Sequence, residues 1–143
     1  MIIKQTNSLT SQIYQDSLAI RHEVFVKEQG VSLELEIEGE EGKTYYVGYV
    51  AEKPVVTARS YLEDATTWHL QRVATLEAFR HQGLAAELLL EIEKQAKKAQ
   101  ITQLTLGAQD SAQGFYQKLG YHVIGAGFLD AGIPHHRMDK FLN

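Results

Sequence analysis

The chain of 143 residues has a mass of 16.1 kDa, the size of one compact domain with a core large enough to hold a ligand cleft. Its formal net charge of −4 and sequence pI of about 5.8 argue against a nucleic-acid partner bound through general phosphate attraction. The absence of cysteine excludes disulfides and thiolate metal sites. It also removes the residue on which transferases most often carry an acyl group, so we expect any acyl transfer to be direct, with a serine or lysine intermediate as the alternative.

The sequence contains no apolar run close to the ~20 residues that a membrane-spanning helix needs. Met1–Gln5 lacks the apolar core of a signal peptide. Internal repeats and proline-rich linkers are also missing. We therefore expect a cytoplasmic protein without a membrane partner, folded as a single domain over residues 1–143.

The first half of the chain predicts a helix, a loop and a hairpin. Ser8 or Thr10 can cap a helix whose apolar residues recur at roughly helical spacing, namely Ile13, Leu18, Ile20, Val24 and Phe25. Residues 34–43 carry five glutamates and two glycines, which indicates a solvated loop. Residues 45–50 and 55–61 are rich in β-formers, and Lys53-Pro54 between them predicts the turn of a β-hairpin.

The second half predicts alternating strands and helices. A strand is expected from about Thr67 to Thr75, then an amphipathic helix from Gly83 to about Ala99 that buries Leu84, Leu88, Leu89, Ile92 and Ala96. Glu93 and Lys97 suit its solvent face as an i, i+4 pair. A strand over 102–106, a short helix over 111–119 that ends at Gly120, and strands over 121–124 and 137–141 follow. This order indicates an α/β chain with a mixed, mainly antiparallel sheet.

The pattern Arg80-x-x-Gly83-x-Ala85 lies between a β-rich segment and the start of the strongest predicted helix. Free backbone N–H groups and the helix dipole favour an anion at such a position. Gly83 lets the backbone approach a ligand closely, and Arg80 adds a donor fork suited to phosphate. Taken alone, the pattern indicates an anion at a helix start, such as a pyrophosphate, or an ordinary helix cap.

A second motif, Phe115-Tyr116-Gln117-Lys118-Leu119-Gly120-Tyr121, follows about thirty residues downstream. Together with Arg72-Val73-Ala74-Thr75 and the turn, it resembles the GNAT superfamily of acyl-CoA-dependent N-acyltransferases. The segments 25–30 and 128–135 resemble its small bacterial YjcF/ElaA-like branch. The resemblance covers nearly the whole chain. It implies one GNAT domain with a mixed, mainly antiparallel twisted sheet, helices on both faces and splayed central strands.

The resemblance also implies a co-substrate, acetyl-CoA, and no metal. In the family, the strand before the turn offers backbone groups to the pantetheine arm, which here implies Val73, Ala74 and Thr75. The turn is expected to hold the pyrophosphate through the backbone of Arg80, His81, Gln82, Gly83, Leu84, Ala85 and Ala86. Gln109 stands where many relatives have an asparagine that contacts coenzyme A.

For the chemistry, Tyr116 matches the family's general acid and is also expected to contact the coenzyme. A phenol stays protonated at neutral pH and can donate to a departing thiolate. The backbone N–H of Val73 is the expected oxyanion donor. Some relatives have a glutamate base at the position of Gln71, whose amide cannot accept a proton. His69, Glu28, Glu23 or a water relay are the alternatives for the base.

The acceptor is expected to face the variable part of the fold, represented by Arg21, Glu23, Glu28 and Gln29. His135 either shapes the acceptor pocket or anchors a turn. Because adjacent residues of a strand point to opposite faces, the pair His135-His136 does not predict a metal site.

The predicted function is therefore an N-acetyltransferase that transfers the acetyl group of acetyl-CoA to a primary amine by direct attack in a ternary complex. Homodimers are common among relatives, so a homodimer is a further expectation. One alternative is a non-catalytic acyl-CoA-binding or sensing module. Another is a nucleotide-binding protein that uses the same helix end.

Overall fold

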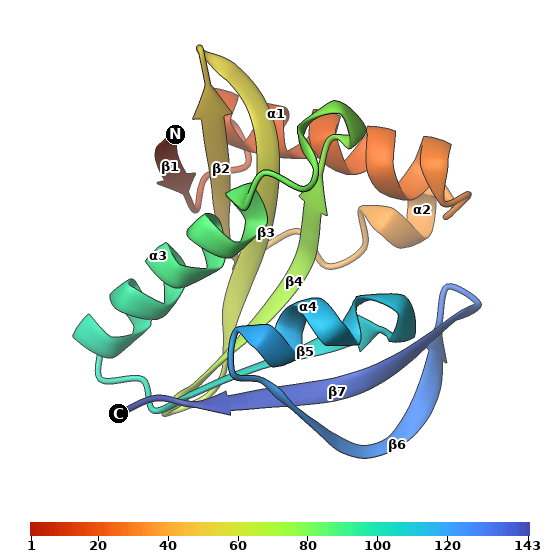
Figure 1. Ribbon diagram of the computed structural model, residues 1–143. Helices are drawn as coiled ribbons and strands as arrows, with labels where there is room; N and C mark the ends of the chain where they lie inside the picture. The colour runs from red at the N-terminus through yellow and green to blue at the C-terminus, as the bar shows by residue number, and fades with distance from the viewer. The chain divides into compact units, whose positions relative to one another are not determined.

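A computed structural model describes residues 1–143 as two compact units. The first unit comprises Met1–Tyr61 and Arg72–Glu91, and the second comprises Leu62–Gln71 and Ile92–Asn143. No helix of the structure is long and apolar enough to span a membrane. The ribbon in Figure 1 carries the element labels used below.

In the first unit, strands β1, β2 and β3 pair in that order, and both pairs are antiparallel. Helix α1 packs against β1 and β2 (Figure 1). A buried apolar cluster of Ile20, Val24, Val47 and Ala74 joins α1 and the π-helical turn after it to strands β2 and β4. The elements of this unit are β1 (Ile2–Thr6), α1 (Gln12–Arg21), a π-helical turn (His22–Glu28), α2 (Leu33–Glu36), β2 (Thr44–Val50), most of β3 (Lys53–Asp64), the end of β4 (Thr67–Thr75), a 3₁₀ turn (Glu77–Phe79) and the start of α3 (Leu84–Lys98).

Local chemistry explains where these elements begin and turn. The side chain of Ser11 accepts a hydrogen bond from the Tyr14 N–H at 3.2 Å, so Ser11 caps α1 and the predicted caps Ser8 and Thr10 are wrong. The β2–β3 turn is formed by Ala51 and Glu52, with φ angles of 49° and 67°, and not by the predicted Lys53-Pro54. Two residues of positive φ match the twist of a tight hairpin. The edge strand β1 was not predicted.

In the second unit, the start of β4 pairs in parallel with β5 (Gln103–Gln109), from Thr67↔Gln103 to Leu70↔Leu106. The order continues as β4-β5-β7-β6, and these further pairs are antiparallel. Helix α4 (Gln113–Lys118) packs against β5 and β6 (Figure 1). Gly120 has a φ of 97°, which confirms the predicted helix end.

The last two strands are longer than predicted: β6 spans His122–Asp130 and β7 spans Ile133–Phe141. They form a hairpin whose turn residues Ala131 and Gly132 have φ angles of 50° and 75°. The weak β-formers Gly125 and Gly127 lie within the register shift between Ile124 and Phe128. These glycines interrupt the local pattern and explain why the sequence predicted only the first three residues of β6.

Helix α3 agrees with its prediction, since Leu88, Leu89, Ile92 and Ala96 are buried. Leu84 is half-buried, and Glu93 does not pair with Lys97 on an open surface as predicted. Its carboxylate accepts instead from Lys140 of β7 at 2.8 Å, and its side chain is 12% exposed.

The prediction of a solvated loop over residues 34–43 is wrong at its start, where Leu33–Glu36 forms the short helix α2, while residues 37–43 lie outside helices and strands as predicted. Ser32 caps the short helix α2, accepting from the Leu35 N–H at 3.3 Å. Glu36 is only 2% exposed, whereas Leu33, Leu35 and Ile37 are exposed. The run of glutamates predicted a surface segment, but Glu36, its second member, is buried and contacts the arginines described below.

Candidate active site

Strand β4 is kinked at Arg72, whose φ of 56° is left-handed although the residue lies within a strand. Arg72 comes two residues after Leu70, the last β4 residue in the described register with β5. A left-handed residue disfavours a regular ladder and re-aims the next peptide group. Val73 directly follows this left-handed residue, a position that suits its predicted role as a donor to a ligand.

The chain after β4 forms the predicted turn in a well-defined conformation. The N–H of Leu76 donates to the Val55 carbonyl at 2.9 Å, which fixes the exit from the strand. His81 and Gly83 then have φ angles of 62° and 76°. The first helical hydrogen bond of α3 runs from the Glu87 N–H to the Gly83 carbonyl at 3.0 Å, so the three N–H groups before Glu87 have no acceptor within the helix.

This turn fits a pyrophosphate. Left-handed residues beside a helix start form a concave set of backbone donors, and the helix dipole adds partial positive charge. A Cβ built on Gly83 meets no atom within 4 Å, so the space in front of the turn is open. The N–H of Arg80 donates to the Glu77 carbonyl at 3.3 Å, so the backbone donors suited to a phosphate group are those of residues 81–86.

The guanidinium of Arg80 is already engaged. Its Nη1 and Nη2 donate to the two carboxylate oxygens of Glu28 at 2.6 and 2.7 Å, and its Nε donates to the Thr75 carbonyl at 3.0 Å. The hydrogen bond from Arg80 lowers the pKa of Glu28, and the same bond raises the pKa of Arg80. Arg80 thus ties the turn to β4 and to the π-helical turn, and Glu28 is a weak proton acceptor.

The other predicted acceptor residues of this unit differ in exposure. Arg21 is fully buried, and its Nε and Nη1 donate to Glu36 and Glu40 at 2.7 and 3.0 Å. Glu23 is exposed and accepts from Lys27 at 2.9 Å, and Gln29 is exposed at the end of the π-helical turn. Glu23, Glu28 and Gln29 are therefore the members of this set that reach solvent. The Arg21 side chain does not, because it is buried in its contacts with the carboxylates of Glu36 and Glu40.

Tyr116 lies in α4 of the second unit and is 8% exposed. Its ring is held edge-on by Phe115 and Tyr121, with centroids 5.0 and 5.8 Å away. Its backbone carbonyl accepts from the Tyr121 N–H at 3.1 Å. Burial raises the pKa of the phenol above its ordinary value, so the hydroxyl keeps its proton at neutral pH.

The remaining predicted residues of the second unit are structural neighbours of β7. Gln109 ends β5 opposite His135. His135 is 8% exposed, its Nδ1 lies 2.6 Å from the Ile133 carbonyl, and its ring stacks on Phe128 at 5.7 Å. Of the two roles left open for His135, these contacts favour the turn anchor.

His69, an alternative for the general base, and His136, the neighbour of His135, both have carboxylate partners. The Nδ1 of His69 lies 3.0 Å from Glu63, which also accepts from Arg137, and the Nδ1 of His136 lies 2.7 Å from Asp110. The structure holds no group of three or more His, Cys, Asp or Glu residues arranged for a metal ion.

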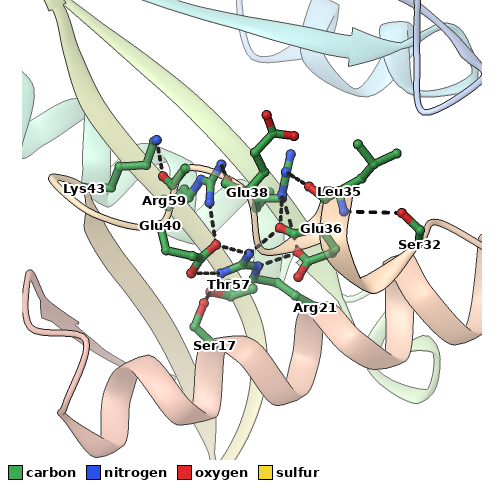
Figure 2. Close-up of polar contacts among 12 residues, drawn as sticks. Ser17, Arg21, Ser32, Leu35, Glu36, Glu38, Glu40, Lys43, Thr57 and Arg59 are labelled. Carbon is green, nitrogen blue, oxygen red and sulfur yellow. Dashed lines mark hydrogen bonds and ion pairs between the residues drawn. The ribbon is translucent and has the colours of Figure 1, made fainter.

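The sequence did not predict a buried charge cluster in the first unit, which Figure 2 shows in close-up. Glu40 accepts from Arg59 at 2.7 Å, from Tyr14 at 2.6 Å and from Arg21 at 2.5 Å. Burial opposes the charged form of Glu40, but the hydrogen bonds from Arg21 and Tyr14 outweigh it and lower its pKa. A signal was present in the sequence, because Arg59 and Arg72 stand among β-formers at positions that ordinarily hold apolar residues.

Residues 8–142 match the family model of the acetyltransferase (GNAT) domain. The chain is 39% identical over 128 residues to the uncharacterized N-acetyltransferase YjcF of Bacillus subtilis, covering 88% of this chain and 91% of that protein. This similarity confirms the predicted superfamily and its YjcF-like branch.

Solved structures agree with the fold. The crystal structure of a putative N-acetyltransferase from Lactobacillus plantarum superimposes with a TM-score of 0.88 at 27% identity, over 100% of both chains. A GNAT family acetyltransferase from Elizabethkingia anophelis with acetyl-CoA bound has a TM-score of 0.74 at 19% identity, over 99% of this chain and 97% of that one. The first comparison confirms a GNAT-like fold with a mixed, mainly antiparallel sheet.

Proposed function

Because this chain belongs to the GNAT acetyltransferase family and is an N-acetyltransferase, we propose that it transfers the acetyl group of acetyl-CoA directly to a primary amine of its acceptor. The observation that carries the choice of acetyl-CoA is the turn Arg80–Ala86, with left-handed His81 and Gly83 directly before helix α3. The structural neighbour from Elizabethkingia anophelis carries acetyl-CoA, which supports the same co-substrate here.

In this proposal, the backbone N–H groups of residues 81–86 hold the pyrophosphate, and Val73, Ala74 and Thr75 offer backbone groups to the pantetheine arm. Gln109 adds a side-chain amide. Arg80 acts through its tie to Glu28 and Thr75, which fixes the turn, and not through a free guanidinium.

Acetyl-CoA, when bound, supplies an activated acetyl thioester. The Val73 N–H donates to the acetyl carbonyl oxygen, and the left-handed Arg72 directly before it supports this role, because such a residue re-aims the peptide group that follows. The Tyr116 hydroxyl donates its proton to the departing sulfur. The place of Tyr116 in the motif over residues 115–121 supports this role, and a phenol is protonated at neutral pH and so holds the proton that this step needs.

We assign the removal of the amine proton to water. Gln71 cannot accept a proton, and Arg80 lowers the pKa of Glu28. Glu23 and Gln29, the exposed neighbours of Glu28, are proposed to face the acceptor. A cytoplasmic location and a homodimer stay predictions of the sequence and of the family resemblance.

Mass spectrometry of an amine panel incubated with the protein and acetyl-CoA tests the proposal. We expect at least one amine to gain an acetyl group, in amounts that scale with protein concentration. Tight binding of acetyl-CoA without any acetylated amine would favour the non-catalytic acyl-CoA-binding module. A parallel thermal-shift measurement separates the ligands: we expect stabilisation by acetyl-CoA, and stabilisation by ATP or NAD alone would overturn the choice of co-substrate.

A further inference from the structure

Arg72, the residue at the kink of β4, is tied to helix α2 by its side chain. Its Nε donates to the Glu36 carbonyl at 3.2 Å, and its Nη2 donates to the Leu35 carbonyl at 3.1 Å. The Nε also lies 3.4 Å from the Glu36 carboxylate. One residue therefore combines a left-handed backbone next to Val73 with a guanidinium anchored on a different element.

The anchor itself is fixed by buried charges. The Glu36 carboxylate accepts from Arg21, which is fully buried, and Arg21 also binds Glu40 (Figure 2). Glu40 in turn accepts from Arg59. We call Arg21, Glu36, Glu40 and Arg59 the charge cluster. Every buried polar side-chain atom of the structure has a hydrogen-bond partner, so the cluster is satisfied and holds α2 in one position.

The orientation of α2 cannot come from apolar burial. Leu33, Leu35 and Ile37 are 50%, 48% and 42% exposed, while Glu36 between them is 2% exposed. Figure 2 shows the Leu35 side chain directed away from the charge cluster. Burial of apolar surface alone would favour the opposite rotation of this helix, because exposed leucines forgo the hydrophobic gain. The charge cluster thus keeps the Leu35 and Glu36 carbonyls within reach of Arg72.

We propose that Arg72 is a positioning residue for acetyl transfer: its tie to α2 holds its own backbone left-handed and so aims the Val73 N–H at the acetyl carbonyl oxygen. A left-handed backbone is unfavourable for a residue with a side chain, and it persists where surrounding contacts impose it. The two carbonyl acceptors on α2 are those contacts. This inference rests on the proposed role of Val73 as the oxyanion donor.

The test uses acetyl-CoA labelled with ¹³C at the carbonyl and bound to the full chain. A carbonyl polarised by an N–H donor moves its ¹³C resonance downfield, so the signal reports the donor without any acceptor amine. We expect a downfield shift on binding to the wild-type protein. Arg72→Ala should bind acetyl-CoA within about threefold of wild-type affinity and lose most of this shift, and its kcat should fall about 10-fold or more while KM changes little.

Matched variants separate positioning from folding. Arg72→Met keeps the aliphatic stem without donors and should behave like Arg72→Ala, which covers the case in which the alanine variant does not fold. Arg137→Ala removes another strand arginine with two carboxylate partners, Glu63 and Asp139, and should keep both the shift and kcat. Added guanidinium ion should restore part of the shift and of kcat to Arg72→Ala.

The outcomes are distinguishable. A wild-type protein that binds acetyl-CoA without a downfield shift would remove Val73 from its proposed role, and the proposed function would fail at that point. A wild-type shift that both Arg72 variants retain in full would overturn the positioning role alone. A shift lost in both variants and kept in Arg137→Ala supports it.

Discussion

Two regions of the first unit are held by opposite means. The turn Arg80–Ala86 relies on backbone conformation at the surface, with left-handed His81 and Gly83 and one half-exposed ion pair between Arg80 and Glu28. The charge cluster next to α2 relies on side chains, and three of its members, Arg21, Glu36 and Arg59, are almost completely buried. A ligand-binding turn must leave its donors accessible, so its conformation has to be maintained by the local backbone. The charge cluster is closed to solvent, so its ion pairs can fix the position of a helix.

This difference predicts which property, stability or coenzyme binding, a substitution in each region should change. Buried charges that lose a partner are costly, while exposed ion pairs contribute little to stability. Changes in the charge cluster should therefore affect folding and the position of Val73. Changes in the turn should affect coenzyme binding and leave the fold nearly intact. The predictions below test this division between effects on folding and effects on coenzyme binding.

The largest effect is expected for Arg21→Ala. The substitution leaves the carboxylates of Glu36 and Glu40 without their central partner in a buried place. We expect a loss of about 3–5 kcal/mol in the free energy of unfolding, measured by urea denaturation. Lys27→Ala, which removes the exposed partner of Glu23, is the control and should change stability by less than about 0.5 kcal/mol. Similar losses in both variants would contradict the division.

Acid should weaken the same cluster. The folded pKa of Glu40 lies below its unfolded value, so its contribution to stability is present above the unfolded pKa and is lost as pH falls through the folded pKa. We expect the melting temperature of the wild-type protein to fall more steeply below about pH 4.5 than that of Glu40→Gln, which has no charge to lose. Parallel pH profiles for the two proteins would show that Glu40 is not the titrating group.

In the turn, Gly83→Val should act on binding. The added side chain projects into the open space proposed for the pyrophosphate, and the φ of 76° adds strain. We expect the affinity for coenzyme A, measured by calorimetry, to fall about 10-fold or more. Gly132→Val is a matched control, because Gly132 has a φ of 75° and equally empty surroundings in the β6–β7 turn. Equal affinities in both variants would count against the turn as the pyrophosphate site.

Tyr116→Phe tests the acid that the sequence predicted. Removal of the hydroxyl should lower kcat about 10-fold or more, while acetyl-CoA binding stays near normal. Tyr121→Phe removes the hydroxyl of the ring that packs edge-on against Tyr116 and should leave kcat close to wild type. Unchanged turnover of Tyr116→Phe in steady-state kinetics would take the acid role away from this residue.

The same two regions show what a sequence can reveal. The strand Thr67–Thr75 and the helix after Gly83 were predicted, because β-formers and a helical period are local signals. The charge cluster was missed, because Glu36 finds its partners Arg21 and Arg72 15 and 36 residues away, and a run of glutamates has the composition of a surface loop. Partners this far apart along the chain meet only in the folded protein, so no local sequence pattern indicates the pairing. The kink at Arg72 was missed for the same reason, since its anchor lies on α2.

The smallest effect is expected for Glu28→Gln, and its sign is informative. The Glu28–Arg80 pair is partly exposed, with side chains 38% and 29% exposed, so stability should change by less than about 1 kcal/mol. In the wild-type protein the Glu28 carboxylate occupies the Arg80 guanidinium. Its neutralisation should make that guanidinium available to phosphate and so tighten coenzyme A binding about 2- to 5-fold at low salt, with a smaller gain at high salt. Calorimetry at two salt concentrations measures both. Weaker binding would mean that Glu28, by holding Arg80 against the Thr75 carbonyl, shapes the turn itself, and the turn would then depend on a side-chain tie much as α2 does.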